Sequence, residues 1–368
     1  MTEANHPTVF ASAANSELQQ AQSVLPDIRR SKLRREFLSQ NLKLRLMSKL
    51  AVIVASGVEG NRYESMPYSF ADFMDSDRLP TLPHVAVRVI ELVQSDEPDV
   101  REISRVIRSD AAIASRILRT GNSALLGMRR SLTSVEEAVP QLGFTLVRTL
   151  VLGCTLSGIR TIPDNAEHAV RAHWRSSLTQ AVFAENLALE TPGADPPTYF
   201  LAGLLQDIGV LAALCIDPEN YLAHVWSESR FPDVTDAEFA YYGFDHTDVG
   251  LRLCSLWGLP ESFCDAVFTH HNSVELPDGA SMLSALHAAN LCSAFVARNG
   301  REGTMDRLAG FLTHHYGWSL EKIEAIVCEA MIQVHESAAL FSYDIGELSG
   351  TRTIENARRL LANLALVD

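Results

Sequence analysis

The sequence lacks the cysteine spacing of a disulfide framework or of a zinc ribbon. Its 368 residues include six cysteines, and no two of them form a Cys-x-x-Cys pair. Cysteines scattered in this way are typical of reduced thiols in a hydrophobic core. We therefore expect neither redox chemistry nor a zinc site built from the cysteines, which are Cys154, Cys215, Cys254, Cys264, Cys292 and Cys328.

The sequence also lacks the signatures of a membrane protein and of a protein that binds nucleic acid over its whole surface. The apolar run from Leu146 to Ile159 is interrupted by Arg148, and a bilayer span takes roughly 20 apolar residues. No basic flank and apolar segment follow Met1, so no export signal is expected. The 31 Lys and Arg are outnumbered by 45 Asp and Glu, and the net charge of −14 opposes phosphate binding over the whole surface. We expect a cytoplasmic protein without a membrane span.

Strand signals are weak, whereas helical periodicity is almost continuous. No alternating strand is followed by a hairpin signal, and apolar residues recur at helical spacing in nearly every segment. A hydrophobic content of 47% supports a folded core rather than disorder. The sequence therefore predicts an all-α protein, and since its length exceeds that of one ordinary domain we expect two or three packed units.

The N-terminal part carries a local excess of positive charge. We expect a disordered tail over residues 1–16, an amphipathic helix over 17–55 and a linker over 56–78. Residues 27–49 contain eight basic and two acidic side chains, a local charge of +6. A membrane surface, a nucleic acid and a protein surface are all open as targets of this helix, and we favour the protein. The residues expected to make the interaction are Arg34, Arg35, Leu38, Leu42, Leu46 and Leu50.

Helix boundaries are predicted from periodicity and from capping residues. Ser134 with Glu137, and Thr235 with Glu238, fit the capping-box pattern at a helix N-terminus. Residues 100–119 also fit a helix-turn-helix, since two short amphipathic helices meet at residues 109–110. Helices are expected over 85–94, 100–108, 111–119, 134–143, 146–156, 164–190, 199–215, 218–229, 236–242, 246–257, 261–271, 279–298, 302–314, 320–345 with a break near His335, and 353–366.

A few polar residues in apolar helices are candidates for chemistry. These are Gln206 and Asp207, His246, and the pair His270 and His271. Helical bundles build metal sites from imidazoles and carboxylates on several helices. Neighbours on one helix point about 100° apart, so His270 and His271 are not expected to serve one ion together. Hydrogen bonding to the backbone is the simpler role for each of them.

The order of several short blocks resembles the HDOD domain family of bacterial signalling proteins. The resemblance covers residues 79–300 and implies an all-helical domain related to the HD hydrolases, with subdomains over 79–160 and 161–300. Residues 301–368 are then C-terminal helices that pack on the second, HD-like subdomain. The matching blocks are Leu79–Pro83, Arg116–Ala124, Ser134–Gly143, Trp174–Ala181, Gly203–Gly209, Gly243–Gly250 and Trp257–Pro260, the last leading to His270 and His271.

The same resemblance implies that most of the hydrolase ligands are gone. HD hydrolases hold metal with a His-Asp pair, an earlier His and a later Asp. Here Gln206 replaces the His of the pair, Ser176 stands at the earlier position and Asn290 at the later one, so only Asp207 is retained. His173 lies three residues from Ser176 and could replace it only by a change of register. We expect a vestigial polar pocket of Ser176, Gln206, Asp207, His246, His270, His271 and Asn290, in which any single metal ion would be held by Asp207, His246 and His270.

We therefore expect a non-catalytic bacterial signal-transduction regulator without a cofactor, acting on a protein partner or a small ligand such as a nucleotide. One alternative is a metal-dependent phosphohydrolase or cyclic-dinucleotide phosphodiesterase with a reduced ligand set. The other is a DNA-binding regulator, because residues 99–130 have a local charge of +4. That role would use Arg101, Arg105, Arg108, Arg116 and Arg119. Nucleic acid is not the expected partner, and the chain has no glycine-rich phosphate loop.

Overall fold

The computed structural model describes residues 67–95, 97–123, 131–156, 164–226, 233–271, 276, 279–297, 303–341, 343–345 and 350–364. In these ranges every regular element is a helix and there is no strand, which confirms the all-α prediction. The predicted tail and the basic amphipathic helix, with its interaction residues from Arg34 to Leu50, lie outside the described residues.

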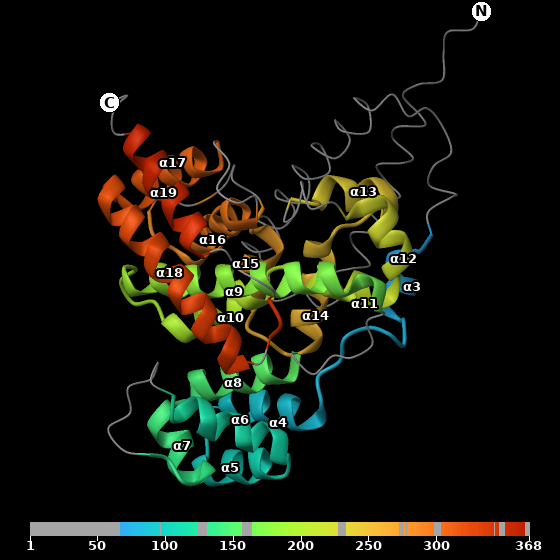
Figure 1. Cartoon of the computed structure of the whole chain (residues 1–368). Helices are drawn as coiled ribbons and strands as arrows, with labels where there is room; N and C mark the ends of the chain where they lie inside the picture. Colours follow the sequence, from blue (N-terminus) through green and yellow to red (C-terminus); the bar gives the residue numbers. More distant parts are fainter. Residues whose placement is uncertain are drawn as a thin grey trace, which may run out of the picture.

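Helices within the described residues 84–156 form the first lobe, at the bottom of Figure 1. Three of them begin where a side chain accepts hydrogen bonds from free backbone N–H groups, and these side chains are Asp99, Asp110 and Ser134. Gly143, with a φ of 78°, separates the last two helices of the lobe. The helices of this lobe are α4 (His84–Val93), α5 (Val100–Arg108), α6 (Ala111–Gly121), α7 (Val135–Leu142) and α8 (Phe144–Leu156).

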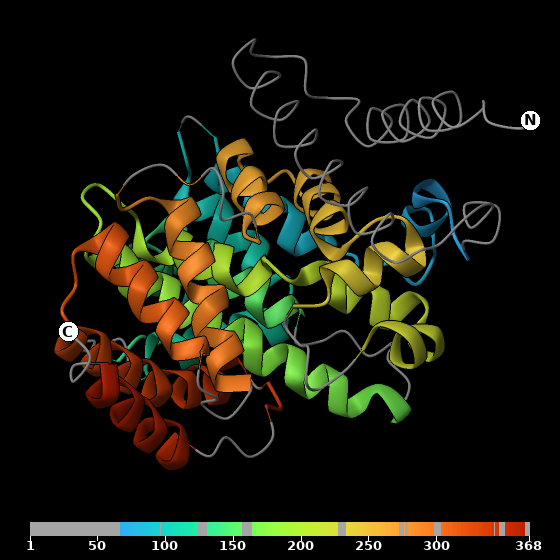
Figure 2. The same ribbon diagram turned by 90° about the horizontal axis from the view of Figure 1, so that it is seen from above.

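The second lobe is built around one long buried helix, α9 (Glu167–Leu189), which the 3-10 turn η3 (Asp164–Ala166) precedes. Helices α10 and α16 pack along it, and α14 packs on α11 and α15. Figure 2 shows this lobe from above, with α9 in bright green. Its other elements are α10 (Pro196–Leu205), α11 (Ile208–Ile216), α12 (Pro218–Asn220), the π-helical turn η4 (Tyr221–Val225), α13 (Thr235–Tyr242), α14 (His246–Leu256), α15 (Glu261–Thr269) and α16 (Met282–Ala297).

The predicted helix over 199–215 is in fact two helices, because the chain turns at Gln206 and Asp207 between α10 and α11. Periodicity missed the turn because residues 199–205 of α10 and all of α11 are buried on every side, so no polar face marks where one helix ends. The combined run Pro196–Ile216 is long and apolar enough to cross a membrane, yet its most apolar window is entirely buried in the protein. The bent pair of α7 and α8 passes the same test. Core helices commonly do, and the burial accounts for the apolar character of the run.

Three further predictions of local structure are wrong. The helix expected over 218–229 is the short α12 followed by η4, which ends at Val225. Helix α13 has Val234 as its N-cap without a side-chain hydrogen bond, so Thr235 and Glu238 form no capping box. Helix α18 runs through His335 unbroken, because the ring nitrogen Nδ1 bonds to the carbonyl of Met331 one turn earlier.

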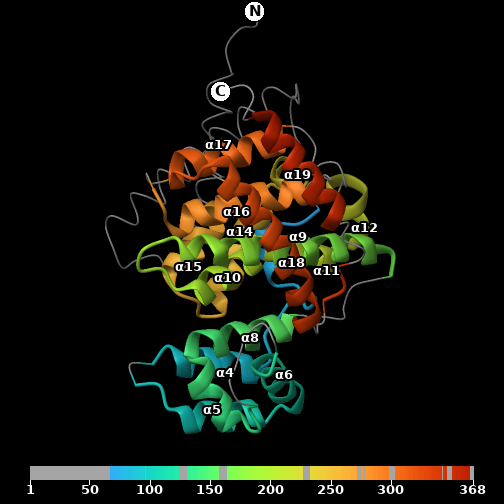
Figure 3. The same cartoon turned by 60° about the vertical axis from the view of Figure 1, so that its left-hand side comes forward.

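Three C-terminal helices cover the second lobe and reach back to the first. They are α17 (Thr304–Tyr316), α18 (Leu320–Phe341) and α19 (Gly350–Leu364). Helix α17 packs on α16, and α18 packs on α9 and extends to α8; Figure 3 shows the end of α18 beside α8. There the hydroxyl of Tyr343 donates to the carbonyl of Gly153, at 2.7 Å, and the ring of Tyr343 stacks on Trp174. The C-terminal segment around Tyr343 therefore contacts both lobes, at α8 in the first and at α9 in the second.

A short helix, α3 (Phe70–Met74), lies within the predicted linker and packs on the second lobe. Phe70 and Phe73 are buried, and both rings pack edge-on against Phe244. Phe244 directly precedes the turn into α14. The residues just before the first lobe therefore support the start of the helix that carries His246.

Candidate metal centre

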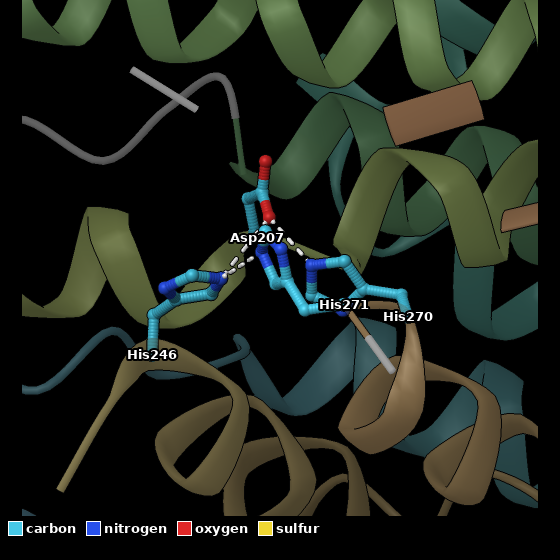
Figure 4. A group of neighbouring side chains, drawn as sticks. All are labelled: Asp207, His246, His270 and His271. Atoms are coloured by element: carbon cyan, nitrogen blue, oxygen red, sulfur yellow. Dashed lines mark hydrogen bonds and ion pairs between the residues drawn. The ribbon is translucent and has the colours of Figure 1, made fainter. Parts of the chain in front are cut away.

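Four side chains from separate parts of the second lobe meet at one point (Figure 4). Asp207, His246, His270 and His271 each offer one ligand atom, and these atoms all lie within 4.8 Å of one another. We expected His270 and His271 to point apart, but both rings belong to this group. Helix α15 ends at Thr269, and the two histidines lie in the turn beyond it. Their ring centroids are 4.2 Å apart.

Local backbone geometry places each of these side chains. Asp207 occupies the turn between α10 and α11, and His246 is the first residue of α14, after the N-cap Asp245. Asp245 and Asp248 form a capping box that fixes the start of that helix. At Gly209 the backbones of α11 and α14 nearly touch, because a Cβ atom there would lie 2.1 Å from the carbonyl oxygen of His246. Only glycine permits this approach.

Hydrogen bonds fix how two of the rings face Asp207. Nδ1 of His270 lies 2.6 Å from the carbonyl oxygen of Val267, which can only accept, so this nitrogen carries a proton. Nδ1 of His246 lies 2.6 Å from Oε2 of Glu238 and donates in the same way. The other nitrogens, Nε2, then face Oδ1 of Asp207 at 3.0 Å from His270 and 3.4 Å from His246.

This arrangement calls for positive charge between the rings and the carboxylate. In neutral imidazoles whose Nδ1 is protonated, each Nε2 presents a lone pair to the oxygen of Asp207, and such atoms repel. Extra protons on the rings or one cation can fill the gap. Imidazole nitrogens with one carboxylate oxygen are ligands that zinc and similar transition metals accept. The donor set therefore fits a single ion of this class.

Asn290 controls the fourth ligand. Its Nδ2 lies 3.3 Å from Nδ1 of His271. Rotation of the amide exchanges its nitrogen and oxygen, and Nδ1 of His271 would then donate and leave Nε2 free to bind an ion. Asn290 is therefore joined to the four-residue group by a hydrogen bond to His271.

The charges of the cluster are strongly shifted. Burial acts to raise the pKa of Asp207, but hydrogen bonds from His246 and His270 outweigh it and hold that pKa well below its usual value. Burial acts to lower the pKa of His246, yet Glu238 and Asp207 raise it well above normal. Burial, followed by repulsion from His270 and His246, holds the pKa of His271 well below normal. Asp207 is therefore an anion and His271 a neutral ligand at ordinary pH.

The other predicted pocket residues lie outside the metal cluster. Gln206 is completely buried, and neither atom of its amide makes a hydrogen bond. Ser176 and His173 are also buried. The hydroxyl of Ser176 and Nδ1 of His173 make no hydrogen bond. Of the three residues that replace hydrolase ligands, only Asn290 contacts the cluster.

Sequence reasoning missed two residues that hold the cluster in place. Gln180 donates to Oδ2 of Asp207 at 2.8 Å and lies 3.2 Å from the hydroxyl of Ser293. Gln180 lies four residues after Ser176, so the two residues share one face of α9, and this spacing could have identified Gln180 from the sequence. Glu238 accepts from Nδ1 of His246. The sequence pattern assigns Glu238 to a capping box with Thr235, which the structure does not contain, so its contact with His246 was missed.

The cluster is closed to solvent on most sides. The side chains of Asp207, His246 and His270 are completely buried, whereas that of His271 is 16% exposed. A hollow beside Glu238 and His246 measures about 10 Å³, room for about one water molecule.

Relatives of known sequence match part of this chain. An uncharacterized protein of Treponema pallidum is 25% identical over 229 residues, which are 60% of this chain and 44% of that protein. The uncharacterized protein YuxH of Bacillus subtilis is 22% identical over 119 residues, 32% of this chain and 28% of YuxH. The chain thus spans less than half the length of these curated relatives.

Solved structures share the fold. An HDOD domain protein of unknown function from Geobacter sulfurreducens is 20% identical, with a TM-score of 0.54 over 79% of this chain and 98% of the other. A candidate phosphohydrolase from Shewanella amazonensis is 19% identical, with a TM-score of 0.51 over 77% of this chain and 96% of the other. The HDOD domain family matches residues 79–273, more than half of the sequence. As its sequence blocks and two-lobed helical structure indicate, this chain belongs to the HDOD domain family.

Proposed function

We propose that this protein is a non-catalytic, cytoplasmic signalling regulator that holds one transition-metal ion in the second lobe and acts by binding a partner. The observation that carries the proposal is the convergence of Asp207, His246, His270 and His271 on one enclosed point. Such an ion would connect the α10–α11 turn, the start of α14 and the end of α15. A bound divalent ion would also supply positive charge able to polarise a water or a phosphate oxygen.

Hydrolysis needs more than this site offers. A phosphodiesterase of the two-metal type needs ligands for two ions and room for substrate beside them. By the family resemblance, Gln206, Ser176 and Asn290 stand at the positions that would supply the remaining ligands, and their uncharged amide and hydroxyl groups are weaker metal ligands than imidazole or carboxylate. Three of the four cluster side chains are sealed from solvent. These features support a structural or regulatory ion rather than a catalytic one.

The partner-binding element we propose is the basic segment of residues 27–54. A helix with leucines on one side and cations on the other suits a groove with an acidic rim. Outside residues 27–49 the chain has a net charge of −14 − 6 = −20, so the segment can also dock on its own body. A small nucleotide bound without hydrolysis is the alternative ligand.

Hydrolysis assays test the proposal directly. The full chain, loaded separately with Mn²⁺, Zn²⁺ and Fe²⁺, is incubated with a cyclic dinucleotide and with a chromogenic phosphodiester. We expect no turnover above that of Asp207→Asn protein. Metal-dependent turnover that is lost in Asp207→Asn would instead show an enzyme.

Metal-dependent phosphoester hydrolysis is the second candidate function, because histidine and carboxylate ligands occur in catalytic zinc sites and the side chain of His271 reaches solvent. DNA binding is disfavoured by the arginines of the first lobe. Arg116 turns inward to the carbonyl oxygens of Cys154 and Phe341. Arg108 pairs with Glu136 at 2.9 Å.

A further inference from the structure

Glu238 is a buried carboxylate in direct contact with the cluster. Its Oε2 lies 2.6 Å from Nδ1 of His246 and accepts from the backbone N–H of the same residue at 2.9 Å. Its Oε1 accepts from the hydroxyl of Tyr221 at 2.7 Å. The residue is 2% exposed, so these bonds are made without competition from bulk water. Both oxygens are occupied, and the carboxylate cannot rotate without breaking a bond.

The geometry around His246 determines which of its nitrogens can bind an ion. While Nδ1 donates to Glu238, the lone pair of a neutral ring is on Nε2, the nitrogen that faces Asp207 and His271. The bond from Glu238 to the backbone N–H of His246 also fixes the first residue of α14. One carboxylate therefore sets both the tautomer and the position of the ring. His270, by contrast, is oriented only by a neutral backbone carbonyl.

We propose that Glu238 is the positioning residue of the metal centre, which makes His246 a stronger ligand and sets the affinity for the ion. The proposal rests on the proposed function, since it assumes that the cluster binds metal. A carboxylate that accepts from the far nitrogen of a ligating imidazole increases the basicity of the ring, and loss of such a partner typically costs 10- to 100-fold in metal affinity. Tyr221 donates to the other oxygen of Glu238, so the series of hydrogen bonds runs from His246 through Glu238 to Tyr221.

The protein offers a closely matched control in Asp217. This carboxylate is 7% exposed and accepts from the hydroxyl of Tyr242 at 3.2 Å and from Asn220 at 2.9 Å. It thus resembles Glu238 in burial and in its bond to a tyrosine. No hydrogen bond or ion pair joins it to the four cluster residues in the described part of the chain. Asp217→Asn consequently removes the same kind of charge without touching a ligand.

The test is a Co²⁺ titration of the metal-free full chain, followed through the visible absorption of the bound ion. We expect Glu238→Gln to weaken Co²⁺ binding by about 10- to 100-fold and to shift the absorption bands. Asp217→Asn should keep the wild-type affinity and spectrum, and Tyr221→Phe should fall between. Glu238→Asp, which keeps the charge, should recover part of the affinity.

The possible failures are distinguishable. If wild-type protein takes up no Co²⁺, the proposed function fails and the role of Glu238 fails with it. If wild-type protein binds Co²⁺ and Glu238→Gln matches it in affinity and spectrum, only the role of Glu238 is overturned. Thermal unfolding in excess chelator shows whether Glu238→Gln is misfolded. If it is, Glu238→Asp and Tyr221→Phe replace it in the test. Wild-type Co²⁺ affinity and spectrum in both of these variants would also overturn the proposal.

Discussion

Nε2 of His246 lies 3.1 Å from Nε2 of His271, while the other nitrogen of His246, Nδ1, donates a hydrogen bond to Glu238. Two imidazole nitrogens at this distance share a proton or face a common cation. Oδ1 of Asp207 lies 3.4 Å from the same nitrogen of His246, so the carboxylate attracts either a proton or a metal ion to this point.

Replacement of Asp207 should abolish metal binding. Asp207→Asn keeps the size of the side chain but removes its charge, so affinity should fall by more than the roughly 100-fold expected for an outer-shell residue. Competition with a metal-sensitive dye measures this loss. The metal-free Asp207→Ala protein should also lose about 3–5 kcal/mol of unfolding free energy, since it leaves buried imidazoles without their anion. Unchanged metal affinity in Asp207→Asn would show that Asp207 is not a ligand.

Buried His173 should make the protein less stable in acid. Burial lowers its pKa from 6.5 to about 4, so the unfolded chain takes up a proton that the folded chain does not. The stabilisation it provides is therefore complete above about pH 6.5 and is lost as the pH falls from 6.5 to 4. Over that range the unfolding free energy should fall by about 3 kcal/mol more in wild-type protein than in His173→Gln. Urea unfolding at several pH values measures the difference.

Exposed His168, on the same helix, supplies the control for that experiment. His168→Gln should keep the pH dependence of the wild-type protein. Equal slopes for His173→Gln and wild-type protein would contradict the assignment to His173.

Gly209→Ala should disturb the metal centre through the backbone. Its new Cβ would lie 2.1 Å from the carbonyl oxygen of His246, so α11 and α14 must separate. We expect a loss of about 1–3 kcal/mol in unfolding free energy, and weaker metal binding because His246 moves. Gly310→Ala is the matched control, since no atom lies within 4 Å of its added Cβ and alanine favours a helix by up to about 1 kcal/mol. Chemical unfolding and Co²⁺ titration of both variants should separate them, and equal effects would exclude the clash as the cause.

The C-terminal segment should stabilise the contact between the lobes. The hydroxyl of Tyr343 is bonded to the carbonyl of Gly153 in α8, and its ring lies 4.1 Å from that of Trp174 in α9. Tyr343→Phe should cost about 1–2 kcal/mol, because it removes a buried hydrogen bond. Calorimetric unfolding measures the loss and should show the first lobe melting earlier. Tyr316→Phe, which removes a bond within the second lobe, should not advance that transition.

Local signals predicted most of the helices, whereas the site depends on contacts between distant residues. Asp99, Asp110 and Ser134 each cap a helix through their own backbone neighbours, so the starts of α5, α6 and α7 could be read from sequence. Asp207, by contrast, is placed by the break between two equally apolar helices, which no periodicity reveals.

The same distinction explains the errors at the metal centre. Glu238 has the spacing of a capping residue relative to Thr235, but its partners Tyr221 and His246 lie 17 and 8 residues away along the chain. His270 and His271 follow the last residue of α15, and their ring centroids are 4.2 Å apart. The family resemblance located Asp207, His246 and the two histidines, and the geometry then joined them into one site.

The metal content of the purified full chain tests the central proposal most directly. After loading with Zn²⁺ and removal of unbound metal, elemental analysis should find about one ion per wild-type chain and almost none per Asp207→Asn chain. Two ions per chain would contradict the proposal in favour of a two-metal hydrolase. No bound ion would show that protons alone hold Asp207, His246, His270 and His271 together.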